Sequence, residues 1–413
     1  MSRHTFSILI LTVSIISLLI ACQPALPPFE CTDAIGCVDI APGEPLKLGV
    51  LYAQNVGPDH YRGVELAVDA RDGQVLGHPI QLQIEDEQCT SEGGTMAALK
   101  IVADPQTVAI VGTTCSGAAT TATKIMSQAG LAMVSGANTA PSLTAIDGEQ
   151  GVDWQPGYLR TAHNEAVAVQ AAATFVFQEL GVTKVATVND GDAYTRGFTD
   201  VFEQAFTDLG GKIVLDLAVN KGDTDMRPVL AAVAASGAEL IFFPIFAPEA
   251  TLIALQAKEV PGLENILLLG SEVLLSNNFI ESVGADGVGL YITSQSAPES
   301  PAYHELISAY ETKYGEPTRS ISLANFYDAA NLLLNAIEAV ATQEKDGALH
   351  IGRQALREAL YATTDFEGVS STYSCDQFGD CSTVGFVIVR LDDPSAGIEG
   401  LQSNVIYTFT PRR

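Results

Sequence analysis

Short apolar runs alternate with amphipathic segments along most of this chain, from Leu46 onward. The apolar runs are mostly uncharged and end at Gly, Asp or Pro, as expected for strands that are covered on both faces. Predicted strands occupy 46–52, 80–85, 108–111, 132–134, 184–189, 212–217, 240–244 and 266–269. Predicted helices occupy 61–70, 93–103, 119–129, 165–179, 194–209, 226–235, 248–258, 301–314 and 324–341. This alternation is typical of α/β proteins built from right-handed βα units on doubly wound parallel sheets.

The alternation predicts two such sheets. An extended piece, YLRTA at 158–162, separates two similar series of four βα units, and a second crossing is predicted near 290–294. Two long helices and a β-rich tail at 368–410 follow. A chain that leaves one lobe, builds another and returns makes a multi-strand hinge with a cleft, where small ligands bind. The predicted lobes are 46–160 with 294–383, and 161–293 with 384–411.

The first residues predict export. Arg3 precedes an apolar run over 6–21, which is shorter than a membrane span and typical of a signal peptide. The run ends in Leu-Ile-Ala-Cys22, which resembles the lipobox of bacterial lipoproteins, so we expect a signal peptide at 1–21 and a lipid on Cys22. An ordinary secretory signal with a chance cysteine is the alternative. Residues 22–45 are rich in Pro, acidic and small residues without an apolar period, and are predicted to be a tether to the outer face of the cell membrane.

The net charge and the length of the chain limit which classes of protein it can belong to. The formal net charge is −28, and it becomes −29 once a signal that carries Arg3 is removed. Such a surface repels phosphate backbones and argues against nucleic-acid binding. About 390 mature residues exceed what one hydrophobic core supports, in agreement with two lobes.

Six cysteines remain besides Cys22, an even number that suits an oxidising compartment. They allow fifteen pairings, but two pairs have only five residues between their members, which suggests local loops. A zinc site is the alternative for those close pairs, although no histidine lies near them and export favours disulfides. The predicted disulfides are Cys31–Cys37, Cys89–Cys115 and Cys375–Cys381.

Several blocks resemble one known family when they are taken in order. They are LKLGVLYA, VAIVGTTCSGAATTA, LAMVSGANTAPSLT, GYLRTA, VNDGDAYTRGF and ILLLGSE, spread over residues 46 to about 411. In this order and spacing they resemble the type I periplasmic binding proteins of the Leu/Ile/Val-binding class. The resemblance implies two lobes with an amino-acid site in the cleft, no cofactor and no catalysis.

In the first lobe, the resemblance places the ligand's α-carboxylate at Ser116. Its strand, Gly/Thr/Ser turn and helix would present free backbone N–H groups to an anion. A plain N-cap for a helix at Ala119 is the alternative. The resemblance also gives Ala137 a carbonyl contact and Thr139 contacts through its hydroxyl and its backbone N–H, bridging ammonium and carboxylate. Asn138 departs from the small residue expected there, and is at best a rim contact or a turn cap.

In the second lobe, the matched positions are Tyr194, Phe246 and Glu272. Tyr194 would close over the ligand, or else be a surface residue at a helix start. Phe246 stands where many relatives carry Tyr, which leaves apolar contact. Glu272 would provide the countercharge for an α-ammonium group, or else be an exposed glutamate at a strand end.

Two further features bear on the pocket. Cys89 and Cys115 fall where relatives have a disulfide, which would stiffen the turn that carries Ser116. The loop at 54–58 is shorter than in relatives, so part of the usual side-chain pocket is missing and the ligand is expected to be larger or different.

We therefore expect a monomeric, lipid-anchored solute-binding protein that presents a small amino-acid-like ligand to an ABC permease by hinge closure. A sensor or envelope scaffold of the same fold, or a binder of an amide or nucleoside, is the alternative. An enzyme is disfavoured: a hydrolase elbow would need glycine at Thr114 and Ala118, and the six histidines form no acid–base set.

Overall fold

The computed structural model describes residues 29–146, 148–296, 298, 300–318, 320, 322–382 and 385–409. The predicted signal peptide, Cys22 and the first part of the predicted tether lie outside these residues. The stretch Asp33–Arg413 forms one compact unit. Within the described residues, no helix combines the length and apolar character needed to cross a membrane.

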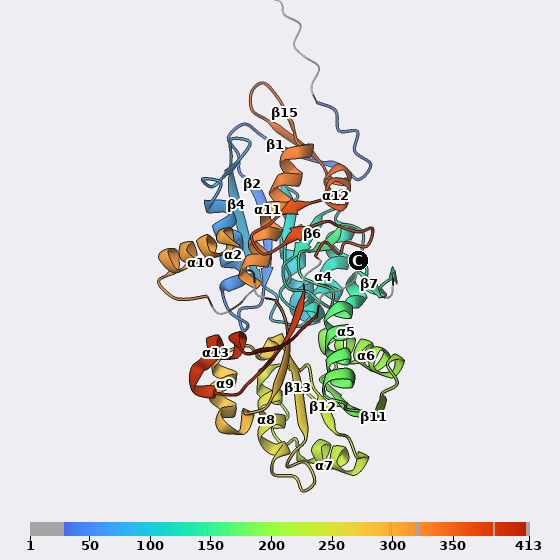
Figure 1. Ribbon diagram of the computed structural model, residues 1–413. Coiled ribbons are helices and arrows are strands. Elements are labelled where there is room, and N and C mark those ends of the chain that lie inside the picture. The colour runs from blue at the N-terminus through green and yellow to red at the C-terminus, as the bar shows by residue number, and fades with distance from the viewer. Residues whose placement is uncertain are drawn as a thin grey trace, which may run out of the picture. The chain divides into compact units, whose positions relative to one another are not determined.

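The first lobe is built on a six-stranded sheet in the order β3-β4-β2-β5-β6-β9 (Figure 1). All neighbours are parallel except β3 and β4. The strands are β2 Leu46–Tyr52, β3 Gln74–Val75, β4 His78–Asp86, β5 Thr107–Val111, β6 Ala132–Ser135 and β9 Tyr158–Arg160. One face packs against α2 Asp59–Asp69, α11 Ser322–Val340 and α12 Arg353–Tyr361, and the other against α3 Ser91–Val102 and α4 Ser116–Gln128. Helix α10, Pro301–Tyr314, packs against α2 and α11.

The second lobe is built on a seven-stranded sheet in the order β11-β10-β12-β13-β14-β19-β20. Strand β19 pairs antiparallel with both of its neighbours, β14 and β20. The strands are β10 Lys184–Asn189, β11 Lys212–Ala218, β12 Leu240–Phe242, β13 Leu267–Ser271, β14 Tyr291–Gln295, β19 Phe386–Arg390 and β20 Val405–Phe409. One face packs against α7 Arg227–Ser236, α8 Ala247–Ala257, α9 Asn277–Val283 and α13 Gly397–Ser403, and the other against α5 Glu165–Thr174 and α6 Ala193–Asp208. A π-helical turn, Phe175–Glu179, continues α5.

Hydrophobic patterning explains these elements. Every residue of β5, TVAIV, is buried, because helices cover both faces of its sheet. Helix α6 turns Phe198, Phe202 and Phe206 toward the core at a spacing of four residues, which places them on one face. Helix α3 begins where Thr90 accepts a hydrogen bond from the Gly93 N–H at 2.9 Å.

The structure also has shorter elements. They are η1 Pro141–Leu143, β7 Ala145–Ile146, β8 Glu149–Gln150, η3 Glu272–Leu274, η4 Gly284–Gly287, β15 Thr342–Gln343, β16 Leu349–Gly352, β17 Phe366–Glu367, β18 Thr372–Tyr373 and η5 Pro394–Ala396. Because η1 and η3 follow β6 and β13, both start at the carboxyl end of a parallel strand, where α/β proteins place ligands.

The predicted two-lobed, doubly wound α/β fold is present, and the division at 160, 293 and 383 stays a prediction. Several segments differ from their predictions. Helices α9, α12 and α13 were not predicted, and α13 interrupts the predicted β-rich tail. Within the expected tether, Cys37–Ile40 forms β1, which pairs antiparallel with β16. Val38 and Ile40 alternate with polar neighbours and are buried in the core of the first lobe, so the chain is anchored there.

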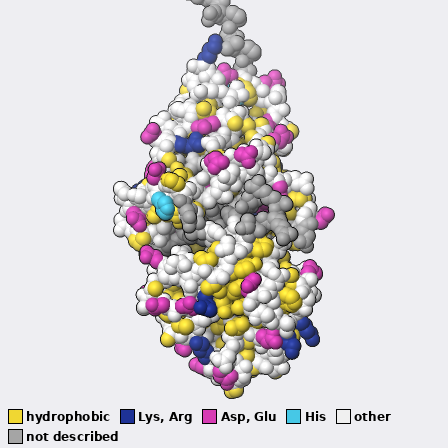
Figure 2. Space-filling model, viewed as in Figure 1, with side chains coloured by type: hydrophobic (Ala, Val, Ile, Leu, Met, Phe, Trp, Pro, Cys, Tyr) yellow, Lys and Arg dark blue, Asp and Glu magenta, His cyan; other side chains and the backbone are white. Residues whose placement is uncertain are grey.

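Acidic side chains are spread over the face shown in Figure 2, and basic side chains form a few separate groups among them. This surface agrees with the excess of acidic residues in the sequence.

Candidate functional site

Ser116 links two turns of the first lobe. Helix α4 begins at Ser116 itself, and Cys115 stands at the N-cap position without a side-chain capping bond. The Ser116 hydroxyl oxygen accepts hydrogen bonds from the N–H groups of Thr139 and Ala140, each at 3.3 Å. The alternative of a plain cap for a helix starting at Ala119 is therefore wrong. Among the described residues, Ser116 only accepts through its hydroxyl, so its proton can be donated to another group.

The turn after β6 is held by buried polar bonds. Ser135 accepts from the N–H groups of Ala137 at 3.2 Å and Asn138 at 3.0 Å. The Asn138 side chain is fully buried and accepts from the hydroxyls of Thr113 and Tyr158, both at 3.1 Å. The prediction of a rim contact at Asn138 is wrong, because its amide is buried and holds the turn through these hydrogen bonds.

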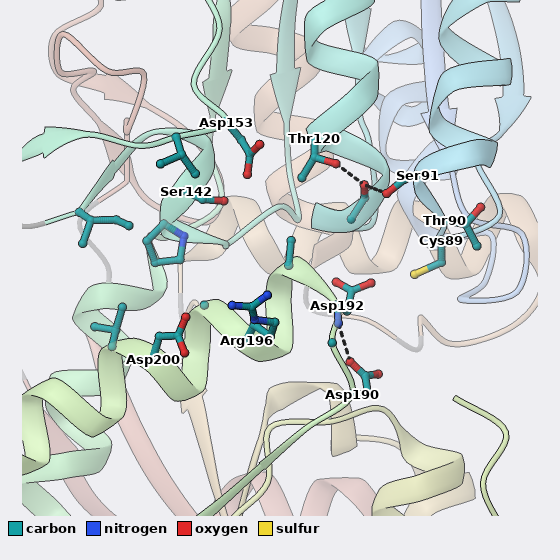
Figure 3. A pocket seen from close by; sticks show the side chains of 18 of the residues that line it. Cys89, Thr90, Ser91, Thr120, Ser142, Asp153, Asp190, Asp192, Arg196 and Asp200 are labelled. Carbon is teal, nitrogen blue, oxygen red and sulfur yellow. Dashed lines mark hydrogen bonds between the residues drawn. The ribbon is translucent and has the colours of Figure 1, made fainter. Parts of the chain in front are cut away.

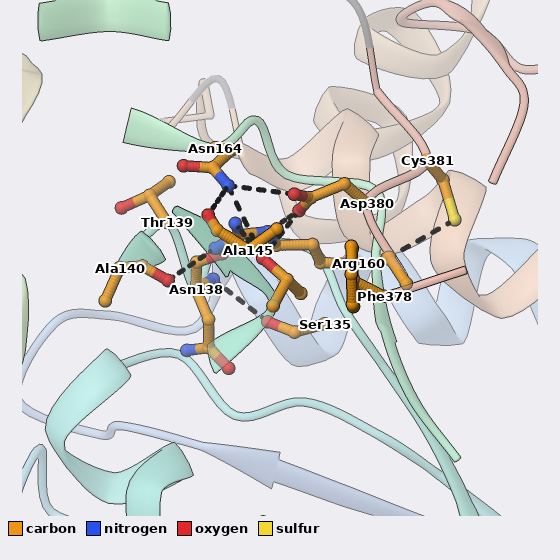
Figure 4. Close-up of polar contacts among 12 residues, drawn as sticks. Ser135, Asn138, Thr139, Ala140, Ala145, Arg160, Asn164, Phe378, Asp380 and Cys381 are labelled. Atoms are coloured by element: carbon orange, nitrogen blue, oxygen red, sulfur yellow. Dashed lines mark hydrogen bonds and ion pairs between the residues drawn. The ribbon is translucent and has the colours of Figure 1, made fainter. Parts of the chain in front are cut away.

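An arginine of the YLRTA segment orders the same turn (Figure 4). The Arg160 side chain is fully buried and donates to the carbonyls of Asn138 at 3.2 Å and Ala140 at 2.9 Å. It also pairs with Asp380 at 2.5 Å and donates to Thr144. A salt bridge and three further acceptors thus set the path of the backbone on both sides of Thr139.

Asp380 belongs to a small loop that the Cys375–Cys381 disulfide closes. Besides Arg160, Asp380 accepts from the Asn164 amide at 2.8 Å. Asn164 is also the N-cap of α5, since its side chain accepts from the Ala166 N–H at 3.0 Å. The tail of the chain therefore positions both the turn around Thr139 and the start of α5.

Glu165, the first residue of α5, lies at the junction of the lobes. Its side chain is fully buried, and Oε1 accepts a short hydrogen bond from the Thr139 hydroxyl. Burial, and the negative charge of Glu272, raise the pKa of Glu165 well above its usual range. Because Glu272 belongs to η3 of the second lobe, an acid from each lobe lies at this junction, and the two carboxyl groups disfavour each other's ionisation.

Glu272 is mostly buried, with 18% of its side chain exposed. Burial raises its pKa to about 7. Its Oε1 lies 3.9 Å from Nε2 of His163, but burial lowers the pKa of His163 to about 3, so the imidazole is neutral and the contact is not an ion pair. The alternative of an exposed glutamate at Glu272 is wrong.

Two aromatic residues of the second lobe adjoin these acids. Tyr194 is 5% exposed, and its hydroxyl lies 2.6 Å from the Ser271 hydroxyl, next to Glu272. The Tyr194 ring centroid lies 5.6 Å from that of Phe246. The surface alternative for Tyr194 is therefore wrong. The two predicted aromatic residues contact each other, and Tyr194 also lies close to Glu272.

The lobes also touch at the starts of α4 and α6. A Cβ placed on Gly117 would lie 2.8 Å from Oδ2 of Asp192. Asp192 is held in place because it caps α6 through the Tyr194 N–H at 3.0 Å and pairs with Lys221 at 2.9 Å. A carboxylate of one lobe thus faces the first turn of a helix in the other, where helix N–H groups favour negative charge.

A cavity of about 620 Å³ opens beside this contact (Figure 3). Its wall includes Ser91, Gly117, Ser142, Asp192 and Arg196, from both lobes. None of the six predicted ligand residues lines this cavity. The cavity is therefore distinct from the predicted site, although Gly117 follows Ser116 directly in the chain.

The turn that carries Ser116 is braced from the side. The Cys89–Cys115 disulfide is present, and Glu87 is fully buried between the two cysteines. The Glu87 carboxylate accepts from the N–H groups of Cys89 at 3.0 Å and Cys115 at 3.1 Å. The Cys31–Cys37 pairing stays a prediction. Within the described residues, no group of three or more His, Cys, Asp or Glu side chains could hold a metal ion.

Five of the six predicted residues are thus connected through hydrogen bonds, a ring contact and the electrostatic interactions of Glu272, and Ala137 is adjacent to them along the turn. Sequence reasoning missed Arg160, His163, Glu165 and Asp380. The signal available was the stretch YLRTAHNE, which begins with strand β9 and carries charged residues, but neither its burial nor its distant partner can be read from the sequence.

The family model, the related sequences and the similar structures all indicate the same family. The family model described as periplasmic binding protein matches residues 47–380. The Leu/Ile/Val-binding protein homolog 3 of Brucella melitensis is 26% identical over 335 residues, covering 80% of this chain and 86% of that protein. The leucine-binding protein LivK of Thermotoga maritima has a TM-score of 0.74 at 23% identity, over 89% of this chain and 99% of that one. LivJ of Streptococcus pneumoniae, solved with isoleucine, has a TM-score of 0.71 at 21% identity, over 89% of this chain and 100% of that one.

Proposed function

This chain belongs to the periplasmic binding protein family, and from that membership we propose that it captures a small amino-acid-like ligand between its lobes for an ABC importer. The observation that carries the proposal is that Ser116 and Thr139 of the first lobe and Tyr194 and Glu272 of the second are linked through the buried Glu165. Hydroxyl donors and a carboxylate at one junction match the two ends of an α-amino acid.

The ligand's carboxylate is assigned to the start of α4. Ser116 keeps a hydroxyl proton to donate, and the first N–H groups of a helix have no intrahelical acceptor. The ammonium group is assigned to the Ala137 carbonyl, the Thr139 hydroxyl and Glu272. Tyr194 and Phe246 contact the ligand's side chain, with Phe246 offering only its apolar ring.

Closure of the lobes is the second part of the proposal. A ligand that bridges both lobes shifts the open–closed equilibrium toward the closed form, which the permease recognises. The contact between the Gly117 backbone and Asp192 supports this, because it can form only when the starts of α4 and α6 approach each other.

Anchoring is the third part of the proposal. A diacylated Cys22 would hold the protein, as a monomer, at the outer face of the cell membrane, because two acyl chains suffice for stable attachment. The experiment is mass spectrometry of the membrane-extracted protein. A diacyl mass on an N-terminal Cys22 is expected, and a water-soluble product without lipid would contradict this part.

A thermal-shift screen of the purified protein against amino acids, small amides, short peptides and nucleosides tests ligand binding. At 100 times its dissociation constant, a ligand adds about 2.7 kcal/mol to the free energy of unfolding, which is readily seen. We expect a shift with amino acids that is lost in Ser116→Ala and in Glu272→Ala. A shift with nucleosides alone would contradict the assigned pocket chemistry.

A further inference from the structure

Glu165 carries a buried oxygen that nothing in the described structure satisfies. The side chain is 0% exposed, Oε1 is bonded to the Thr139 hydroxyl, and Oε2 has no hydrogen-bond partner among the described residues. A buried carboxylate oxygen without a partner is costly, and native structures rarely contain one without a functional reason.

The charged groups around Glu165 do not provide a counter-ion. Glu272 of η3 and Asp192 of the α6 start are acidic, and the neutral Tyr194 hydroxyl is engaged with Ser271. The nearby cation is Arg160, whose guanidinium is committed to Asp380, Thr144 and two backbone carbonyls. No ion pair to Glu165 is found among the described residues, and the one cation near it, Arg160, is already paired with Asp380.

Resting on the proposed function, we propose that Glu165 is a second carboxylate ligand that binds the ammonium group of the amino acid together with Glu272, and that the pair makes the site selective for primary amines. The Thr139 hydroxyl strengthens the arrangement. Because it donates its proton to Glu165, its lone pairs are left to accept from the same ammonium.

The chemistry of the head group follows from the acceptors. A primary ammonium has three N–H donors, and Glu165 Oε2, Glu272 and the turn that contains Ala137 and Thr139 offer an acceptor for each. A trimethylated amine has no N–H to donate, and a hydroxyl in place of the amine brings no charge to two buried acids. Ligands of both kinds should therefore bind weakly.

The test uses the full protein and calorimetric dissociation constants. The probe is whichever of L-leucine, L-isoleucine and L-alanine gives the largest thermal shift with the wild type, together with its analogue that has a hydroxyl in place of the α-amino group. Replacement Glu165→Gln removes the charge at nearly constant shape. We expect it to weaken the amino acid ten- to hundred-fold, the range of a charge-assisted hydrogen bond, and to leave the hydroxy analogue little changed.

Glu203→Gln is the matched control, because Glu203 on α6 also accepts a hydrogen bond from a threonine, Thr187, away from the junction. It should leave both ligands unchanged. Equal weakening of amine and hydroxy analogue by Glu165→Gln would show a merely structural role and overturn the inference alone, as would unchanged amine binding. A wild type that binds none of the amino acids would overturn the proposed function as well.

A melting temperature for ligand-free Glu165→Gln at or above that of the wild type is expected, because the variant no longer buries a carboxyl group whose ionisation is costly. Its measurement separates loss of the fold from loss of binding.

Discussion

At the scale of single residues, buried carboxyl groups stand out. Burial raises the pKa values of Glu87 and Glu272 each to about 7, because both lie where their charged forms lose hydration. When such a buried carboxyl group ionises, the folded protein loses stability. Carboxyl groups with raised pKa values are typical of binding sites, where a ligand can compensate the charge.

The pH dependence of the free energy of unfolding should show the cost of burying ionised Glu272. Its pKa is about 7 in the folded protein against 4.5 for the ordinary side chain, so its favourable contribution is present below pH 4.5 and is lost as the pH rises through about 7. Ligand-free Glu272→Gln should match the wild type near pH 4 and be more stable by about 1–3 kcal/mol near pH 8. Thermal unfolding across this range measures the difference.

The exposed acid Glu305 provides the control, and Glu305→Gln should show no such trend with pH. A Glu272→Gln variant that is less stable than the wild type at pH 8 would contradict the account of a buried, poorly compensated charge.

Arg160 is a second buried charged residue whose contribution to stability can be measured. Replacement Arg160→Met leaves the Asn138 and Ala140 carbonyls and part of the Asp380 carboxylate without their donor. The free energy of unfolding should fall by about 3–5 kcal/mol, as is usual when one partner of a buried ion pair is removed. Urea denaturation measures this loss.

Arg390 serves for comparison because it pairs with Asp392 at the surface, with 40% and 46% of the side chains exposed. Arg390→Met should cost less than about 1 kcal/mol. Similar losses for the two arginines would show that burial of the Arg160 network is not what stabilises the turn.

At the scale of elements, the turn between β5 and α4 is held by the Cys89–Cys115 disulfide and by hydrogen bonds to Glu87. The Cys89–Cys115 disulfide spans 26 residues in sequence, whereas the Cys375–Cys381 disulfide spans six. A cross-link over a longer loop removes more entropy from the unfolded chain, so the two should differ in their effects on stability.

We expect the double replacement Cys89→Ser with Cys115→Ser to lower the free energy of unfolding by about 3–4 kcal/mol, and Cys375→Ser with Cys381→Ser by about 2 kcal/mol. Ligand affinity should fall in both variants, since one loosens the Ser116 turn and the other loosens Asp380. Denaturation and calorimetry on the same samples check both parts. Unchanged affinity in both variants would mean that neither brace positions the site.

At the scale of the whole molecule, the two lobes contact each other at the starts of α4 and α6. Gly117 admits Asp192 only because it has no side chain, and Asp192 cannot retreat easily while it caps α6 and pairs with Lys221. This contact makes a steric test of closure available without changing any side chain that is assigned to the ligand.

Gly117→Ala should hinder closure, because its Cβ would lie 2.8 Å from the Asp192 carboxylate. The ligand should bind at least about tenfold more weakly, a loss of about 1.4 kcal/mol, and cause less compaction in small-angle scattering than in the wild type. Adding Asp192→Ser makes room while keeping a helix cap, and should restore compaction. Full compaction in Gly117→Ala alone would contradict the closure mechanism.

The sequence by itself determined the alternation of strands and helices, because burial on both faces and helical amphipathicity are written in consecutive residues. It also located the Gly/Thr/Ser turn at Ser116 and the acid after the strand at Glu272, since both follow directly from strand ends. Two of the predicted disulfides, Cys89–Cys115 and Cys375–Cys381, are present.

Only the tertiary structure decided which polar groups meet. Arg160 and Asp380 are 220 residues apart, and nothing in their local sequence indicates a shared ion pair. Val38 and Ile40 have the composition of a tether around them, and only β16 gives them a partner strand. Glu165 became part of the junction only because the crossing segment carries it to Thr139 and toward Glu272. Such contacts depend on the packing of distant segments, whereas the elements themselves depend on their own residues.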